Sequence, residues 1–443
     1  MFKKTKKMKV VLATLLALAL TLGLAPMSYA DDPDISGQRE AAITKVLKVP
    51  IGTALPEGSF VFDVDGVSVN GITSVAPPAI GQVVIPIPDQ ATLIAEQPDP
   101  PGDVDIYYFE SDSIFENTVW PEAGIYEYFI AENATDSADY FTLDPNKETL
   151  SYSVAGYQVK VYVREYDDDD EKDGLIPQGK SIGDPYIYAI GAKRTITEDG
   201  TPGTDKVDPT PGGDQDTYFY SQMTFTNIYT KRGGTGTEDP DDPDNVNALS
   251  ITKAVTGDFG SKTAYFPFTV TFVQPSLVTA AQTYRGYILD GDGNIIDPAT
   301  NGVASTAIAT DGLGQKYVKF PSGSGISFGL QDGQKIAFTD VHIGSGYAVV
   351  EAGSPGYVAT AIVVTAGAAD NKTGSGLSNG ITISGQRVGE EPNSVAVTNE
   401  YDGEIDTGIL INNLPFFSLI ALAGLGLIVF LVAKNRRRKA EEL

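Results

Sequence analysis

The chain has 443 residues, of which 42% are hydrophobic, enough to form the cores of two or three domains of ordinary size. Its formal net charge of -27 argues against electrostatic binding to nucleic acid or to an anionic membrane, because those partners attract basic surfaces. The absence of cysteine excludes disulfides, thiolate metal sites and thiol catalysis, and a single histidine, His342, argues against histidine triads and multi-histidine metal sites.

Residues 1–30 have the pattern of a secretory signal peptide. Lysines between Lys3 and Lys9 precede an apolar run that begins at Val10, and Ser28-Tyr29-Ala30 offers a small-residue cleavage site. We therefore expect the mature chain to begin near Asp31 and to lie outside the cytoplasm.

Residues 31–232 alternate short strand-like runs with turns rich in glycine and proline, which is typical of an all-β domain. An antiparallel β-sandwich is favoured, because a parallel sheet would need helical crossovers that the sequence does not suggest. The acidic run 167–171 is expected to be a solvated hairpin tip, with a calcium loop as the lesser alternative. The clearest strands are 59–64, 82–87, 124–131, 149–165, 185–192 and 218–229.

Residues 233–247, GGTGTEDPDDPDNVN, lack apolar periodicity and are predicted to be a linker. A second antiparallel sandwich is expected over 248–402. The DGDGN sequence at 290–294 resembles half of a calcium loop, but without flanking helices and a distal glutamate it is better interpreted as a β-turn. The expected strands of this domain are 249–255, 265–272, 283–289, 335–339, 346–351, 358–364 and 394–401.

The C-terminal part has the features of a membrane anchor. Residues 414–433 are uncharged and long enough to span a bilayer as a helix, and the basic tail 434–443 follows them. The positive-inside rule places this tail in the cytoplasm and both predicted domains outside. Residues 403–413, which precede the span, contain the sequence EIDTG.

Each expected domain contains three polar residues in the same chain order: a lysine in its first strand, a glutamate at the end of a middle strand and an asparagine in its last strand. Side chains two positions apart point to the same side of a strand, so all three are predicted to fall on apolar, inward faces. An unpaired ammonium on such a face would be very costly. The first trio is Lys45, Glu132 and Asn227, and the second is Lys253, Glu351 and Asn399.

Such a trio has a definite chemistry. Burial favours the neutral amine and the protonated acid, and an amine held against a carboxamide polarised by that acid can expel ammonia and leave a Lys–Asn isopeptide bond. The simpler interpretation is a lysine that reaches solvent or forms an ion pair with the glutamate. One domain alone favours the simpler interpretation, but recurrence in two domains favours the bond. Neither a cofactor nor a metal is required.

The motifs Ile-Thr-Lys in the first strand, Tyr-x-Ile/Val-x-Glu in a middle strand and Thr-Asn-x-Tyr in the last strand resemble those of Gram-positive major pilins and related surface adhesins. The resemblance implies tandem immunoglobulin-like domains of the collagen-adhesin B type with internal isopeptide bonds. By position it makes Lys45 and Lys253 the nucleophiles, Asn227 and Asn399 the acceptors, and Glu132 and Glu351 the catalytic acids.

The same resemblance implies that a sortase cleaves between Thr407 and Gly408 and joins Thr407 to peptidoglycan or to a neighbouring pilin subunit. Glu404 and Ile405 stand where the usual signal has leucine and proline. No clear polymerisation motif is present, and Lys193 and Lys206 are candidates for the receiving lysine because they lie in turn-like stretches.

The sequence as a whole therefore predicts a secreted, anchored structural protein, either a pilin subunit or an adhesin stalk, and not an enzyme with turnover. A host or matrix ligand is compatible with this function, whereas nucleic acid is not an expected partner. The alternatives are an extracellular carbohydrate-active enzyme, for which no paired carboxylates stand out, and a single-copy ligand-binding adhesin.

Overall fold

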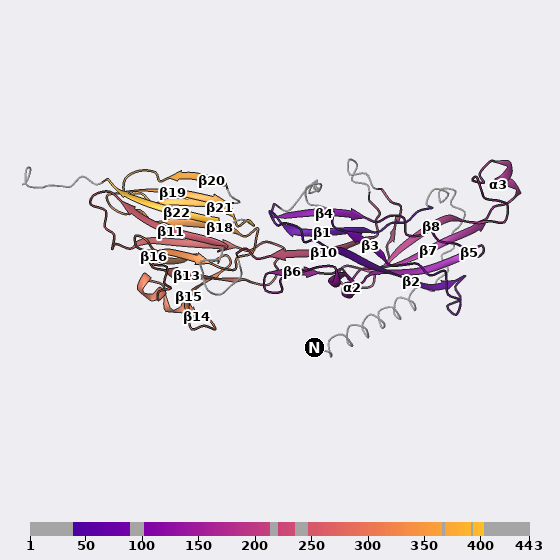
Figure 1. Cartoon of the computed structure of the whole chain (residues 1–443), viewed down its shortest axis with the longest axis horizontal. Coiled ribbons are helices and arrows are strands. Elements are labelled where there is room, and N and C mark those ends of the chain that lie inside the picture. Colours follow the sequence, from indigo (N-terminus) through magenta and orange to yellow (C-terminus); the bar gives the residue numbers. More distant parts are fainter. Residues whose placement is uncertain are drawn as a thin grey trace, which may run out of the picture.

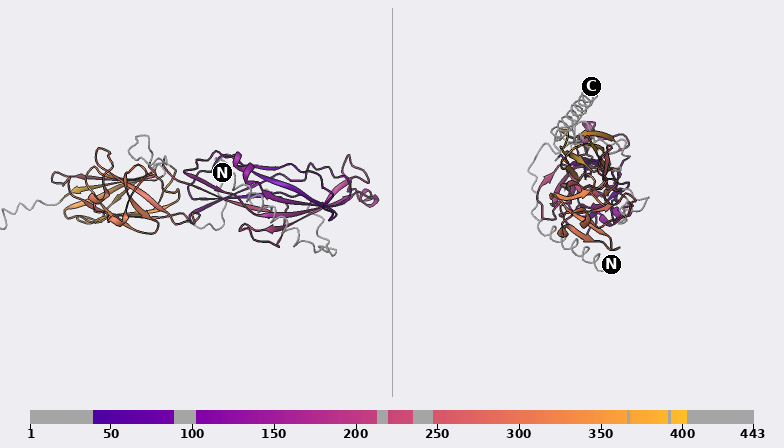
Figure 2. Two further views of the ribbon diagram at one scale, coloured as in Figure 1. Left: turned by 90° about the horizontal axis from the view of Figure 1, so that it is seen from below. Right: turned by 90° about the vertical axis from the view of Figure 1, so that its left-hand side faces the viewer.

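The computed structural model describes residues 39–88, 102–212, 220–234, 247–365, 368–390 and 393–402. These residues form two β-sandwiches that lie end to end in an elongated molecule (Figures 1 and 2). The predicted signal peptide (1–30), the sorting sequence with Thr407 and Gly408, the membrane span (414–433) and the basic tail lie outside the described residues. Within the described part, none of the helices has the length and apolar character of a membrane span.

The first sandwich has a four-stranded and a six-stranded sheet. Short helices α2 (Ala134–Asp139) and α3 (Asp168–Lys172) follow strands β5 and β7. In spatial order the smaller sheet contains β4 (Val104–Glu110), β1 (Thr44–Pro50), β10 (Thr224–Lys231) and β6 (Glu148–Ser151). The larger sheet contains β3 (Val83–Pro86), β2 (Ser59–Val69), β5 (Gly124–Glu132), β7 (Gly156–Glu165), β8 (Pro185–Ile196) and β9 (Lys206–Val207).

The second sandwich has an eight-stranded and a four-stranded sheet. Its short 3₁₀ helices are η3 (Pro298–Asn301) and η4 (Ser305–Ala307). The larger sheet contains, in order, β14 (Ile308–Thr310), β15 (Lys316–Pro321), β13 (Thr283–Leu289), β17 (Lys335–Phe338), β11 (Leu249–Thr256), β22 (Asn393–Tyr401), β19 (Tyr357–Thr365) and β20 (Ala368–Thr373). The smaller sheet contains β16 (Ile326–Leu330), β12 (Phe266–Val273), β18 (Gly346–Glu351) and β21 (Ile381–Arg387).

The two cores follow the alternation of the strands. In β11 and β12 every second residue is buried, because successive side chains point to opposite faces of a sheet. Aromatic side chains fill much of the space between the sheets, and many meet at tilted or edge-to-face angles, as Phe62 and Phe225 do at 4.9 Å between ring centroids. The prediction of an all-β chain with sandwich domains is confirmed.

The prediction of purely antiparallel sheets is wrong at one position in each sandwich. The first and last strands of each domain lie side by side and run parallel, β1 with β10 and β11 with β22. Helical crossovers are not needed for this pairing, because the strands of the opposite sheet make the long connection between the two ends of the domain. Every other strand pair is antiparallel among the described ladders.

Three smaller predictions also differ from the structure. The run 149–165 is two strands, β6 and β7, separated by residues 152–155, which leave one sheet and enter the other. The acidic run 167–171 is indeed at the tip between β7 and β8, but it forms helix α3, which Asp167 caps. Lys193 and Lys206 are not in turns: they lie in β8 and β9 and face each other in the ladder.

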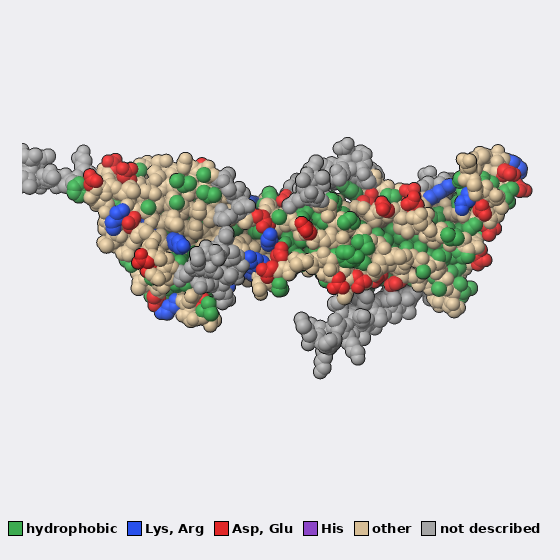
Figure 3. Space-filling model, in the orientation of Figure 1, with side chains coloured by type: hydrophobic (Ala, Val, Ile, Leu, Met, Phe, Trp, Pro, Cys, Tyr) green, Lys and Arg blue, Asp and Glu red, His purple; other side chains and the backbone are tan. Residues whose placement is uncertain are grey.

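The junction between the sandwiches is held by backbone and charged contacts. Arg232 forms a β-bridge with His342, and its guanidinium lies 3.2 Å from the Asp340 carboxylate. The Lys231 ammonium lies 2.8 Å from Glu390 of the second sandwich. Acidic side chains are also spread over the face drawn in Figure 3, in keeping with the net charge of -27.

Candidate functional site

The parallel pairing of first and last strands places the lysine and asparagine of each trio on neighbouring strands. In the first sandwich Lys45 is opposite Phe225, so Asn227 is opposite the residue two positions after the lysine. In the second sandwich Lys253 is opposite Val397, and Asn399 again lies two positions further along. Residues two apart share a face of a sheet, so each lysine and asparagine point into the same core.

In the first sandwich Glu132 contacts both of the other predicted residues. The Lys45 Nζ atom lies 2.8 Å from Glu132 Oε2, and Asn227 Nδ2 donates to Glu132 Oε1 at 2.9 Å. Both charged side chains are fully buried, as is Asn227. The lysine therefore does not reach solvent, which excludes that part of the simpler interpretation, whereas the ion pair with Glu132 is present.

Ser153 is part of this site, although no sequence motif indicates it. Its backbone N–H points at two acceptors, Glu132 Oε2 at 2.8 Å and Asn227 Oδ1 at 2.7 Å. Its hydroxyl donates to Glu198 Oε2 at 2.6 Å, and the other oxygen of Glu198 accepts the Thr226 N–H at 2.6 Å. Ser153 lies in the crossing from β6 to β7, and only the fold brings that crossing to the end of β5.

The second trio has the same arrangement with fewer partners. Lys253 Nζ lies 3.1 Å from Glu351 Oε1, and Asn399 Nδ2 donates to the same oxygen at 2.7 Å. All three residues are at most 2% exposed. Glu351 Oε2 and Asn399 Oδ1 are buried without a hydrogen-bond partner among the described residues. Buried polar atoms without partners are costly, so this site is not simply a satisfied structural ion pair.

Burial shifts the pKa values of ionisable side chains in the trios. It lowers the pKa of Lys45 to about 8, and the Glu132 carboxylate opposes this shift only in part. Burial likewise lowers the pKa of Lys253 to about 8 against the opposing effect of Glu351. The pKa of Glu351 is raised by burial, while the Lys253 ammonium acts in the opposite direction. The surroundings thus make both lysines easier to deprotonate, and in the second trio they also favour the protonated form of Glu351.

Aromatic rings cover both amines. Lys45 Nζ lies 4.5 Å from the centroid of the Phe60 ring, and Lys253 Nζ lies 4.3 Å from that of Phe266. These two phenylalanines occupy equivalent second strands, β2 and β12, and each is at most 1% exposed. The rings keep water from the amine, and a dry amine close to an amide is what nucleophilic attack requires.

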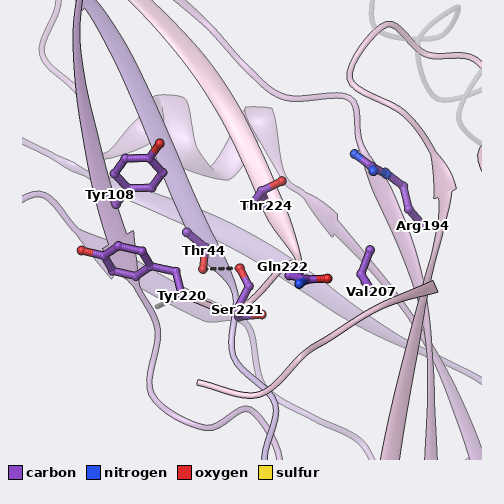
Figure 4. Close-up of a pocket in the computed structure, with 8 residues that line it drawn as sticks. All are labelled: Thr44, Tyr108, Arg194, Val207, Tyr220, Ser221, Gln222 and Thr224. Carbon is purple, nitrogen blue, oxygen red and sulfur yellow. Dashed lines mark hydrogen bonds between the residues drawn. The ribbon is translucent and has the colours of Figure 1, made fainter. Parts of the chain in front are cut away.

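A cavity of about 510 Å³ lies beside β1, which contributes Thr44 to its lining (Figure 4). Thr44 and Ser221 lie in its wall and are joined by a hydrogen bond of 2.8 Å, and the stacked rings of Tyr108 and Tyr220 lie beside them. The cavity does not contact the trio, because successive residues of β1 point to opposite faces. Within the described ranges, no group of acidic or histidine side chains has the arrangement of a metal site.

The remaining predicted residues do not join either trio. Lys193 is half-buried in β8, and Lys206 is exposed in β9. Thr407 and Gly408 are outside the described part of the chain.

Comparisons with known proteins give one family match and several structural neighbours. Residues 247–401 match a family described as a domain of unknown function (DUF7601). No match was found among curated proteins. The fold is similar to that of a variant of the major pilin from Streptococcus pyogenes, with 16% identity and a TM-score of 0.30, covering 82% of this chain and 99% of that one.

Two further neighbours are of the same kinds. The major pilin T3.2 from Streptococcus pyogenes is 18% identical with a TM-score of 0.29, over 82% of this chain and 99% of that one. The pilus-presented adhesin Spy0125 is 11% identical with a TM-score of 0.23, over 82% of this chain and all (100%) of the other. These three neighbours are two major pilins and one pilus-presented adhesin.

Proposed function

We propose that the protein is a structural component of a bacterial cell surface, a pilin subunit or the stalk of an adhesin, whose two sandwiches are each closed by a Lys–Asn isopeptide bond. The supporting observation is the recurrence of the complete trio. In both domains a buried glutamate contacts a buried lysine and a buried asparagine, with the same register between the strands that carry lysine and asparagine. An ion pair alone would not require the buried asparagine in either domain.

The reaction needs only groups that the site contains. The lysine ammonium gives a proton to the glutamate, and the neutral amine attacks the Cγ atom of the asparagine. The glutamic acid then protonates the departing nitrogen of the asparagine and becomes a carboxylate. This carboxylate takes a proton from the attacking nitrogen of the lysine. One C–N bond forms, one breaks, ammonia leaves, and the glutamate ends protonated. The shared glutamate holds both reacting groups in place, and this proximity supplies the acceleration; the reaction happens once in each domain.

The unpartnered atoms of the second trio support this proposal. After the reaction a protonated Glu351 can donate through one oxygen to the new amide carbonyl and accept the new amide N–H with the other. Both Glu351 Oε2 and the former Asn399 Oδ1, which lack partners before the reaction, would then be hydrogen-bonded. The cost of burying these atoms would thereby be removed.

The topology gives the bonds a mechanical role. The end of β10 lies at the junction, where the Ile343 N–H donates to Lys231, and β1 runs in the same direction as β10. Tension that enters at the start of β1 and leaves at the end of β10 therefore shears the two strands against each other. A bond between Lys45 and Asn227 would carry this force and bypass the intervening chain. The same reasoning applies to β11 and β22.

Export, anchoring and partners complete the proposal. The chain would be secreted, anchored by the span at 414–433, and joined by a sortase at Thr407 to peptidoglycan or to a lysine of a neighbouring subunit. Lys206 is the better-placed candidate for the receiving lysine because it is exposed on β9, whereas Lys193 is half-buried. Covalent ladders in denaturing gels of surface extracts would indicate a pilin, and their absence with intact internal bonds would indicate a single-copy adhesin.

The decisive experiment is the intact mass of the mature protein and of three variants. We expect a deficit of two ammonia molecules relative to the sequence, and a deficit of one in Lys45→Met and in Lys253→Met. Lys160→Met is the matched control, because Lys160 also pairs with a glutamate, Glu127 at 2.6 Å, but belongs to neither trio. It should keep both deficits, and an unmodified mass of the parent protein would exclude the bonds.

A further inference from the structure

The two trios differ in what surrounds the asparagine carbonyl, the atom on which negative charge develops during the reaction. In the first sandwich Asn227 Oδ1 accepts the Ser153 N–H at 2.7 Å. In the second sandwich Asn399 Oδ1 has no donor among the described residues. The domains therefore have matching reactive groups but different stabilisation of the tetrahedral intermediate.

We infer, building on the proposed isopeptide reaction, that the backbone N–H of Ser153 is an oxyanion donor that accelerates bond formation in the first sandwich, and that the second sandwich depends on Glu351 alone. A preorganised donor 2.7–3.1 Å from the developing oxyanion is the geometry that stabilises such intermediates. The observed distance of 2.7 Å already lies in this range. The site is also dry, which strengthens the interaction.

The proton transfer within the trio favours this role. Before the reaction the Ser153 N–H is shared between the Glu132 carboxylate and Asn227 Oδ1. When Glu132 takes the proton of Lys45, it loses its negative charge and becomes a weaker acceptor. The N–H is then directed to the asparagine oxygen, which gains charge in the next step.

Topology explains why only one sandwich has this donor. In the first sandwich residues 152–155 connect β6 directly to β7, and this short crossing passes over the trio. In the second sandwich β19 takes the place of β6 beside the last strand, and β20 is inserted before β21, which pairs with the glutamate strand β18. The inserted strand makes the crossing begin one strand further from β22, and among the described residues no backbone N–H donates to Asn399 Oδ1.

The direct test replaces the N–H and nothing else. Residue 153 of the full chain is introduced as the α-hydroxy counterpart of serine by stop-codon suppression in cell-free translation, which converts the amide to an ester. Ammonia loss is followed against time through the cross-linked peptides of each domain. We expect the first bond to form about 100-fold more slowly, the size of effect seen when one oxyanion donor is removed, while the second bond keeps its rate.

The control is the same ester substitution at Val154, the exposed next residue of the crossing, which leaves the Ser153 N–H in place. It should form the first bond near the parent rate. An ester at residue 153 that forms the bond as fast as the parent would overturn the inference, and so would an ester at residue 154 that is as slow as the one at residue 153. Absence of the first bond from the parent protein would instead refute the proposed function.

A second comparison does not depend on folding of the ester variant. Glu132→Gln and Glu351→Gln remove the acid from each domain but leave the amines buried. Because Ser153 still stabilises the oxyanion, we expect slow residual bond formation in the first domain, at least tenfold faster than in the second. Equal residual rates in the two domains would contradict the inference.

Discussion

Replacing Asn227 by alanine should convert the first sandwich from an inextensible unit into one that unfolds under force. The isopeptide bond would join Lys45 to Asn227, which lie on neighbouring strands, and would shield the chain between them from tension. That chain is about 180 residues long, and an extended residue spans about 3.5 Å, so unfolding of the variant should release about 600 Å. The parent protein should release almost none of this length.

Single-molecule force spectroscopy on the full chain, held at its two ends, measures this length directly. Asn399→Ala should release about 500 Å from the second sandwich, because about 145 residues separate Lys253 from that asparagine. The double variant should show both steps. Lys160→Met, which loses only a half-buried ion pair outside both trios, should remain inextensible. Steps of about 600 Å and 500 Å in the parent protein would refute both internal bonds.

Further predictions concern stability and pH. Lys253→Met should lower the unfolding temperature of the second sandwich by about 10–20 °C in calorimetry. By analogy with disulfides, a bond that closes a loop of about 145 residues raises the free energy of unfolding by about 5 kcal/mol. An unchanged unfolding temperature would contradict the bond in that domain. The rate of ammonia loss in the first domain should be level just below pH 8 and fall about tenfold per pH unit above it. The ion pair and the neutral Lys45–Glu132 pair hold the same number of protons, and the proton that they share is lost above the lysine pKa of about 8. A rate that rises with pH would show that Glu132 does not act as an acid. Burial lowers the pKa of His342 from 6.5 to about 4, so the unfolded chain binds more protons than the folded chain between these two pH values. The free energy of unfolding should therefore increase by on the order of 3 kcal/mol as the pH rises from 4 to 6.5. His342→Gln should flatten this slope in denaturant unfolding at several pH values, and an unchanged slope would mean that other groups cause it.

The sequence by itself determined the fold class and the members of both trios. Alternation with period two marked the strands and their buried faces, and it placed Lys45, Glu132 and Asn227 on inward faces before any contact was known. Short motifs were enough for this prediction, because the face to which a side chain points depends only on its position within its own strand. The same argument identified Lys253, Glu351 and Asn399.

Only the tertiary structure decided which strands are neighbours and in which direction they run. The parallel pairing of β1 with β10 is a contact between opposite ends of a domain, and local periodicity carries no information about such pairs. The same holds for Ser153: its N–H reaches Asn227 because the crossing from β6 to β7 passes over the trio, whereas in the second sandwich β20 is inserted before the crossing and no described residue donates to Asn399 Oδ1. Almost every residue carries a backbone N–H, so residue type cannot identify which one acts as the donor. Only the path of the folded chain places the Ser153 N–H beside Asn227.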